Sequence, residues 1–161
     1  MRRVTAALPV LAAVVLASCG ESTVDRGNAE RLIRDAVADQ IHSRVASVRC
    51  PADVEQEAGR RFTCVVTGTD GSRGDANVTQ REGGGLSITA PFLDVREAEA
   101  VMTERLATSS KLRGLKVACP EIVVVKKDAR FTCEATAAGR PRTISVRLTD
   151  AAGRFQYRLR S

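Results

Sequence analysis

Residues 50–64 read CPADVEQEAGRRFTC, and residues 119–133 read CPEIVVVKKDARFTC. Both stretches begin with Cys-Pro and end with Arg-Phe-Thr-Cys, and corresponding positions are 69 residues apart. Four identical positions in a row at a matched cysteine spacing rarely arise by chance. The sequence therefore predicts a tandem duplication of one small module.

Each copy opens with the pattern of an amphipathic helix. Asn28 is the expected N-cap of the first helix and Asp94 that of the second. Apolar residues then recur at steps of three and four, which places them on one helix face. In the first copy these are Leu32, Ile33, Ala36, Val37 and Ile41; in the second they are Val95, Ala98, Val101, Met102 and Leu106.

Strand patterns follow each helix. In the first copy they cover residues 45–50, 61–68, 76–81 and 86–90, and in the second Ile144, Val146 and Leu148 alternate with polar residues before Phe155, Tyr157 and Leu159 do the same. Strict alternation indicates one buried and one wet face, and the buried face can cover the helix stripe. The expected fold class is α+β: two tandem small modules, each with one helix packed on a four-stranded antiparallel sheet and one disulfide.

Four cysteines of the repeats allow three disulfide pairings. Duplication favours Cys50–Cys64 and Cys119–Cys133, because each ancestral module had to close its own bridge. A metal site built from all four is disfavoured, since metal-binding pairs are usually two to four residues apart and an oxidising compartment forms disulfides.

The fifth cysteine belongs to the N-terminus. Arg2 and Arg3 precede an uncharged stretch over 4–18, which is too short to span a membrane and ends in Leu-Ala-Ser-Cys-Gly at positions 16–20. This ending resembles the lipobox of bacterial lipoproteins, in which diacylglycerol is attached to the cysteine, here Cys19. An ordinary cleaved signal with a chance cysteine is the alternative.

These features divide the chain into four parts. Residues 1–18 are expected to be a lipoprotein signal peptide, 19–27 the lipidated cysteine and a tether, 28–91 the first module and 92–161 the second. The predicted location is the outer face of the cytoplasmic membrane, in the cell envelope, with the membrane contacted through the lipid anchor.

Composition and motifs give little sign of catalysis. The formal charge of +6 includes Arg2 and Arg3, and with 3% aromatic residues the chain does not resemble a nucleic-acid binder. His42 is the only histidine and is expected to be solvated, and the paired cysteines leave no free thiol. No metal, nucleotide or other cofactor motif is found, so we expect a non-enzymatic protein; an envelope hydrolase is the least favoured alternative.

Arginines distinguish the second copy. The predicted wet sheet face carries Arg147, Arg154, Arg158 and Arg160, where the first copy has mostly Asn, Thr and Ser. Guanidinium groups pair bidentately with phosphate and carboxylate, so this face is a candidate anion-binding site for headgroups, wall polymers or an envelope protein. The competing interpretation is that charge merely keeps the exposed sheet soluble.

With the lipobox, the helix and the Cys-Pro…Phe-Thr-Cys unit, the chain resembles actinobacterial envelope proteins of the domain-of-unknown-function family DUF4333. The resemblance covers both repeats and implies a small α+β domain without an assigned activity or catalytic residues. The doubled plan is similar in architecture alone to secreted β-lactamase-inhibitory proteins. We therefore expect a binding or accessory lipoprotein, and the alternative is an inhibitor of a secreted enzyme acting through the loop over 70–75.

Overall fold

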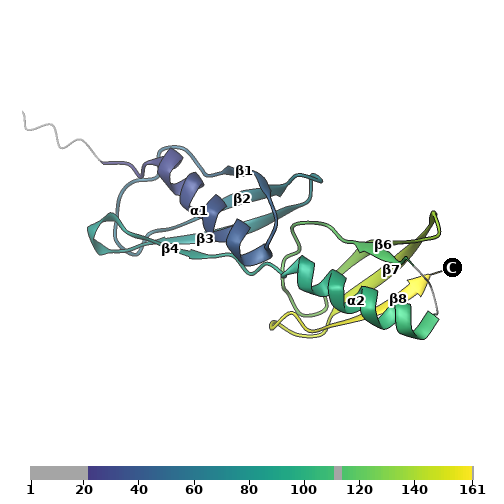
Figure 1. The fold of residues 1–161 in the computed structure, drawn as a ribbon. Coiled ribbons are helices and arrows are strands. Elements are labelled where there is room, and N and C mark those ends of the chain that lie inside the picture. Colours follow the sequence, from purple (N-terminus) through teal and green to yellow (C-terminus); the bar gives the residue numbers. More distant parts are fainter. Residues whose placement is uncertain (1–21, 111–113, 161) are drawn as a thin grey trace, which may run out of the picture.

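The computed structural model describes residues 22–110 and 114–160, and these form two modules with the same order of elements. The first module contains α1 (Arg26–Ile41), β1 (Val45–Arg49), β2 (Arg61–Gly68), β3 (Arg73–Gln80), a short 3-10 helix (Glu82–Gly84) and β4 (Leu86–Thr89). The second contains α2 (Val95–Ser110), β5 (Lys116–Ala118), β6 (Arg130–Ala137), β7 (Arg140–Leu148) and β8 (Phe155–Arg160). The sheets are antiparallel, with strand orders β1-β2-β3-β4 and β5-β6-β7-β8. The predicted tandem α+β architecture is confirmed (Figure 1).

The first helix begins earlier than the sequence suggested. Its N-cap is Asp25, whose Oδ1 accepts a hydrogen bond of 3.0 Å from the backbone N–H of Asn28, so Asn28 is not the cap. Asp94 occupies the equivalent position in the second module and accepts from the N–H of Glu97 at 3.1 Å, as expected. An isolated bridge between Thr23 and Glu55 also ties the segment before α1 to the module. Residues 22–27, expected to be tether, are therefore part of the fold.

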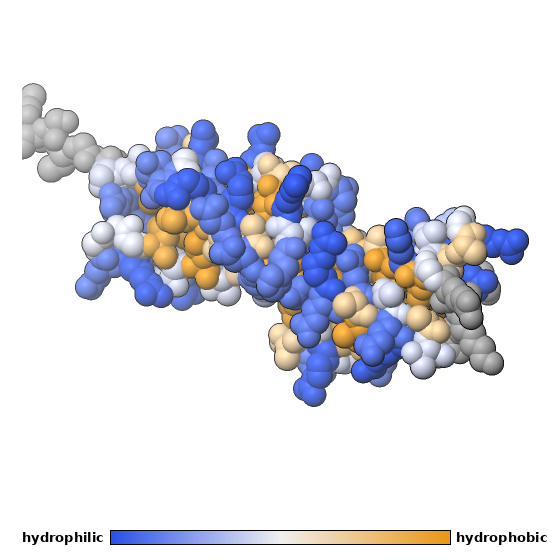
Figure 2. All heavy atoms as spheres, in the orientation of Figure 1, coloured by the Kyte–Doolittle hydropathy of each residue, from blue (hydrophilic) through white to orange (hydrophobic). Residues whose placement is uncertain are grey.

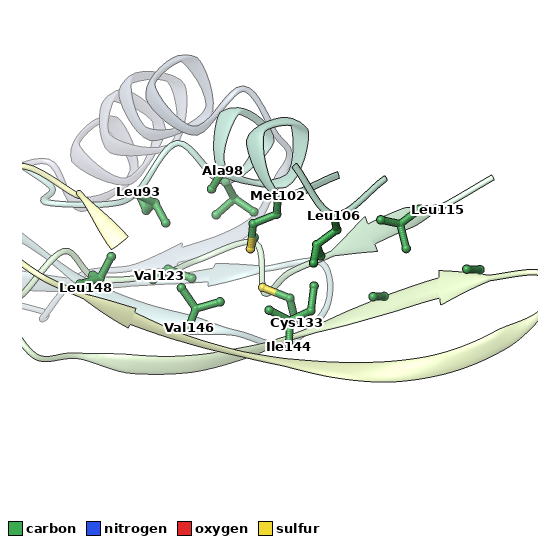
Figure 3. Close-up of a cluster of buried hydrophobic side chains, with 13 residues drawn as sticks. Leu93, Ala98, Met102, Leu106, Leu115, Val123, Cys133, Ile144, Val146 and Leu148 are labelled. Carbon is green, nitrogen blue, oxygen red and sulfur yellow. The ribbon is translucent and has the colours of Figure 1, made fainter. Parts of the chain in front are cut away.

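Each helix buries one face against the inner face of its own sheet. In α1 that face consists of Ala29, Ile33, Val37 and Ile41, whereas Leu32 and Ala36, predicted to belong to it, are exposed. In the second module Met102 and Leu106 of α2 point toward Ile144 and Val146 of β7 (Figure 3). Met102 and Ile144 are fully buried. Removal of one such side chain from water contributes about 1.5–3 kcal/mol, which is a large share of the stability of a module this small.

Each disulfide joins two cysteines of the same module. Cys50 pairs with Cys64 in the first module and Cys119 pairs with Cys133 in the second, as the duplication predicted. A helix carboxylate supports each bridge. Glu30 accepts a hydrogen bond from the backbone N–H of Cys50 at 3.1 Å, and the N–H of Cys119 donates to the carboxylate of Glu99 at 2.8 Å. Helix, bridge and first strand are thereby linked in the same way in both copies.

A two-stranded ribbon packs between the modules. Phe92 forms a bridge with Val124, and the N–H of Leu93 donates to the carbonyl of Val123 at 2.9 Å. Successive residues of an extended segment point to opposite sides. Phe92 and Ile122 accordingly lie in the core of the first module, whereas Leu93 and Val123 lie in the core of the second.

Polar contacts also connect the two modules, at the turn between β2 and β3. We call these contacts and the ribbon together the joint. Glu121 accepts hydrogen bonds from the backbone N–H of Thr69 and from its hydroxyl, the latter at 2.6 Å. In return the N–H of Glu121 donates to Asp70 at 3.0 Å, and the N–H of Ile122 donates to the Ser72 hydroxyl at 2.9 Å. Two residues of the loop over 70–75, which the inhibitor alternative named, thus bind the second module: these are Asp70 and Ser72.

Asp70 is ionised more readily than an isolated aspartate. Burial raises its pKa, but hydrogen bonds from the side chain and backbone of Ser72 and from the backbone of Glu121 outweigh that effect. The pKa of Asp70 therefore lies below its ordinary value. The charged carboxylate is the form that holds the turn and the second module together.

Candidate anion-binding face

Three of the four predicted arginines share the exposed face of the second sheet. Arg158 lies opposite Ser145 and Arg160 opposite Thr143, while Arg147 lies opposite Gln156. All three arginines are exposed, and the residues between them along the strands point toward α2. The alternation used to place these side chains is therefore present in the structure.

Arg154 has a different place and a different partner. It precedes β8 and forms a salt bridge with Asp150, which also accepts hydrogen bonds from the backbone N–H groups of Ala152 and Arg154. Burial raises the pKa of Asp150, but the hydrogen bonds from Arg154 and Ala152 lower it by more. Arg154 thus stabilises the turn between β7 and β8 and is already neutralised.

Arg147 is neutralised as well. Its Nε donates to Oδ1 of Asp128 at 3.1 Å, and one of its terminal nitrogens donates to the same oxygen. The hydrogen bond from Arg147 lowers the pKa of Asp128, and the nearby charges of Lys127 and Arg130 add to this effect. Two of the four arginines predicted for the face are therefore committed to internal ion pairs.

Two arginines that were not predicted for this face join the remaining pair, Arg158 and Arg160. Arg130 of β6 lies directly opposite Arg147, and Arg105 comes from α2. Within the described residues, no salt bridge forms at Arg105, Arg130, Arg158 or Arg160. The signal for Arg130 was present, because it precedes Phe131 and alternates with Thr132 in the repeated motif; Arg105 carried no comparable signal.

These side chains line a hollow of about 820 Å³. Its lining contains five arginines and no carboxylate: Arg105, Arg130, Arg147, Arg158 and Arg160. Its lining also includes three partly exposed aromatic residues, Phe131, Phe155 and Tyr157. The rings of Phe155 and Tyr157 are tilted against each other with centroids 6.3 Å apart. The hollow combines uncompensated positive charge with apolar surface.

A second hollow, of about 620 Å³, continues along β8 toward the turn that precedes it. It shares Arg105, Phe155 and Gln156 with the first, and its other side is formed by the first half of α2, including Glu97 and Val101. The first hollow lies along β6, β7 and β8, with Arg105 contributed by α2, and the second lies between α2 and the start of β8; we call the two together the β8 groove. Figure 2 shows that apolar side chains are exposed next to the helices, where polar side chains surround them.

The first module keeps one of these arginines, Arg61 in place of Arg130, and differs at others. In the 69-residue repeat, Ala36 corresponds to Arg105 and Thr89 corresponds to Arg158. β4 is four residues long, against six for β8, and Pro91 follows it shortly before α2. The charged β8 groove is therefore a feature of the second copy alone.

Other residues singled out from the sequence have the following places. Cys19 lies outside the described residues. His42 is 68% exposed, yet its Nδ1 lies 2.8 Å from Oδ2 of Asp94, the N-cap of α2, so it contributes to the joint. The described part of the chain holds no cluster of three or more histidine, cysteine or acidic side chains suited to a metal ion. Neither of its helices is both long and apolar enough to cross a membrane.

Comparison with known proteins gives one result. A family model for a domain of unknown function (DUF4333) matches residues 9–85 and again residues 83–153. The two matches follow the duplication, and each ends before the last strand of its module, β4 or β8. No curated protein and no solved structure matches the chain.

Proposed function

The chain belongs to the DUF4333 family, whose domain it carries twice, and on that premise we propose that it is a non-enzymatic lipoprotein of the cell envelope that binds an anionic partner through its second module. The first hollow of the β8 groove carries this proposal: its lining contains five arginines and no carboxylate. Four of those arginines have no salt bridge among the described residues, so they are available to phosphate or carboxylate groups.

The anchor is the second element of the proposal. Acylation of Cys19 would hold the protein at the outer face of the cytoplasmic membrane. The fold is described from Ser22 onward, so the chain between Cys19 and Ser22 can span at most roughly 11 Å. The first module would then lie close to the bilayer, much closer than a tether reaching to residue 27 would allow.

This arrangement favours a partner other than the anchoring membrane. The two modules lie at opposite ends of an elongated molecule, with the residues before α1 at one end and the C-terminal end of β8 at the other (Figure 1). The first module thus separates the β8 groove from the anchor. Anionic wall polymer or an acidic protein fits this position better than headgroups of the same bilayer.

Binding can be tested with soluble protein that begins at Gly20 and so retains every described residue. We expect polyphosphate and polyglutamate to bind at low salt, and the double variant Arg158→Ser/Arg160→Ser to bind them more weakly. The variant Arg49→Ser/Arg61→Ser is the matched control, because it removes the same charge from exposed positions of the first module. Equal weakening by both variants would show a general charge effect and contradict a site at the β8 groove.

The anchor is tested separately by mass spectrometry of the protein isolated from its native membranes. The proposal requires an N-terminal Cys19 that carries a diacylglycerol thioether. An unmodified thiol at this position would contradict it.

A further inference from the structure

β8 has a free edge. It pairs with β7 alone, as the last strand in the order β5-β6-β7-β8. The N–H of Thr149 donates to the carbonyl of Arg154 at 2.7 Å, so these two residues form a hydrogen-bonded pair next to the ladder between β7 and β8. Because such pairs alternate, the N–H and C=O groups of Phe155, Tyr157 and Leu159 point away from β7. No other backbone segment of the described chain pairs with them.

Such edges are usually protected in soluble proteins. Short length, a proline, charged side chains, or a covering helix or loop are common devices, and β4 of the first module is short and closely followed by Pro91. β8 has six residues and no proline, and its charged residues, Arg158 and Arg160, repel basic strands but not acidic ones. Its inward-facing side chains, Phe155, Tyr157 and Leu159, remain partly exposed although they pack against the core. The β8 groove runs along this strand and provides space beside it.

We propose that the free edge of β8 binds an extended, acidic segment of a partner protein, which adds to the sheet as a fifth strand. This proposal rests on the proposed function and names the chemistry of its partner. Backbone groups of the segment would pair with Phe155, Tyr157 and Leu159, as in other complexes formed by strand addition.

The two faces of β8 specify what that segment must look like. Side chains of an added strand alternate, so every second one would lie beside Gln156, Arg158 and Arg160 on the outer face. The intervening ones would face Phe155 and Tyr157 in the β8 groove. The arginines favour glutamate or aspartate and the aromatic rings favour apolar residues, so the expected partner alternates acidic with apolar residues.

A second copy of the same chain fits this edge poorly. Pairing two β8 strands would bring Arg158 and Arg160 of one chain close to the same arginines of the other. Like charges on neighbouring strands destabilise a sheet. The charge pattern that favours an acidic peptide therefore disfavours self-association through β8.

The experiment uses soluble protein from Gly20 and a fluorescent peptide as long as β8, six residues, in which glutamate and valine alternate. Binding is followed by fluorescence anisotropy, and amide hydrogen exchange is followed by NMR. We expect binding together with slowed exchange at the N–H groups of Phe155, Tyr157 and Leu159. The same peptide N-methylated at alternate residues should bind at least about tenfold more weakly, because it cannot complete the hydrogen-bond ladder.

Charge variants test whether the arginines of β8 contribute to peptide binding. Arg158→Ser/Arg160→Ser should weaken peptide binding by roughly 3- to 30-fold, and the matched control Arg49→Ser/Arg61→Ser should leave it unchanged. Both substituted arginines of β8 are exposed, so the fold should be preserved, which the NMR spectrum checks.

The other outcomes overturn specific statements. Equal binding of the N-methylated peptide, or unchanged exchange at β8, would refute strand addition while leaving the anion-binding function intact. Binding of polyphosphate or anionic vesicles without any binding of the peptide would refute the acidic-protein partner. Dimers that form through β8 would identify a second copy as the occupant and refute the proposal. Failure of every anionic probe would refute the proposed function itself.

Discussion

Gly74 tests whether the two modules are joined as the structure describes. It lies buried in β3, beneath the ribbon that connects the modules. A Cβ at this position would lie 2.5 Å from Cε1 of Phe92 and 2.9 Å from methyl carbons of both Ile122 and Val124. These three residues surround Gly74 so closely that only a hydrogen fits, so Gly74→Ala should force the second module away from the first.

The expected magnitude follows from two opposing effects. Alanine restricts the unfolded chain and would alone stabilise the protein by about 0.4–1 kcal/mol. Forcing a methyl group into a closely packed site costs about 1–3 kcal/mol. The net loss of unfolding free energy should be about 1–2 kcal/mol, which lowers Tm by roughly 2–8 °C in a protein of this size.

Thermal denaturation followed by circular dichroism measures this loss. Gly85→Ala is the control, because a Cβ there would meet only a carbon of Arg81 at 3.7 Å and φ is −67°. Adding Phe92→Ala removes the nearest atoms, so Gly74→Ala should cost much less in that background than in the wild type. Equal Tm values for Gly74→Ala and Gly85→Ala would refute the close packing of the ribbon on β3.

Three further predictions concern the elements that hold each module and the joint. Glu99→Ala should lower the unfolding free energy by about 1–3 kcal/mol, because it leaves the N–H of Cys119 without its hydrogen-bond acceptor. Urea denaturation measures this loss. An unchanged midpoint would contradict the role of that hydrogen bond. Removing the second disulfide by Cys119→Ala/Cys133→Ala should cost about 3 kcal/mol, since the cysteines are 14 residues apart, and a variant as stable as the wild type would contradict this. The lowered pKa of Asp70 predicts stability that is present above the ordinary aspartate pKa and is lost as the pH falls through the lower folded-state value. Asp70→Asn should flatten this part of the pH–stability curve, and parallel curves for variant and wild type would show that Asp70 does not couple the modules.

The repeat made most of the fold predictable. The cysteine spacing and the shared Arg-Phe-Thr-Cys motif gave two modules and both disulfides, because a duplicated unit must be stable on its own. Period-two alternation placed Arg147, Arg158 and Arg160 on one exposed face. Such features depend on residues close together in the chain, which is where sequence patterns carry the most information.

The joint between the modules was missed, although one signal was present. Residues 122–125 form a continuous apolar run, whereas the equivalent residues 53–56 of the first copy include charged ones. A continuous run is typical of an extended segment buried on both faces. Ile122 and Val123 are such a case, because they enter the cores of different modules.

The sequence did not indicate which arginines form ion pairs and which do not. Arg147 and Asp128 are 19 residues apart and meet only because β6 and β7 pair as they do. Arg105 lies on α2, and no pattern in the sequence of this helix predicted that its side chain would line the first hollow. Which charges are compensated, and which remain available to a ligand, is decided by tertiary contacts.

The central claim is that β8 of the second module, and not its counterpart in the first, contacts the partner of this protein. A photo-crosslinking amino acid at the exposed position Gln156, compared with one at the equivalent Ser87, tests this in cells that produce the full chain. We predict an adduct from position 156 whose linked segment alternates acidic and apolar residues, and its loss in the Arg158→Ser/Arg160→Ser background. Equal adducts from both positions, or an adduct that persists without those arginines, would contradict the claim.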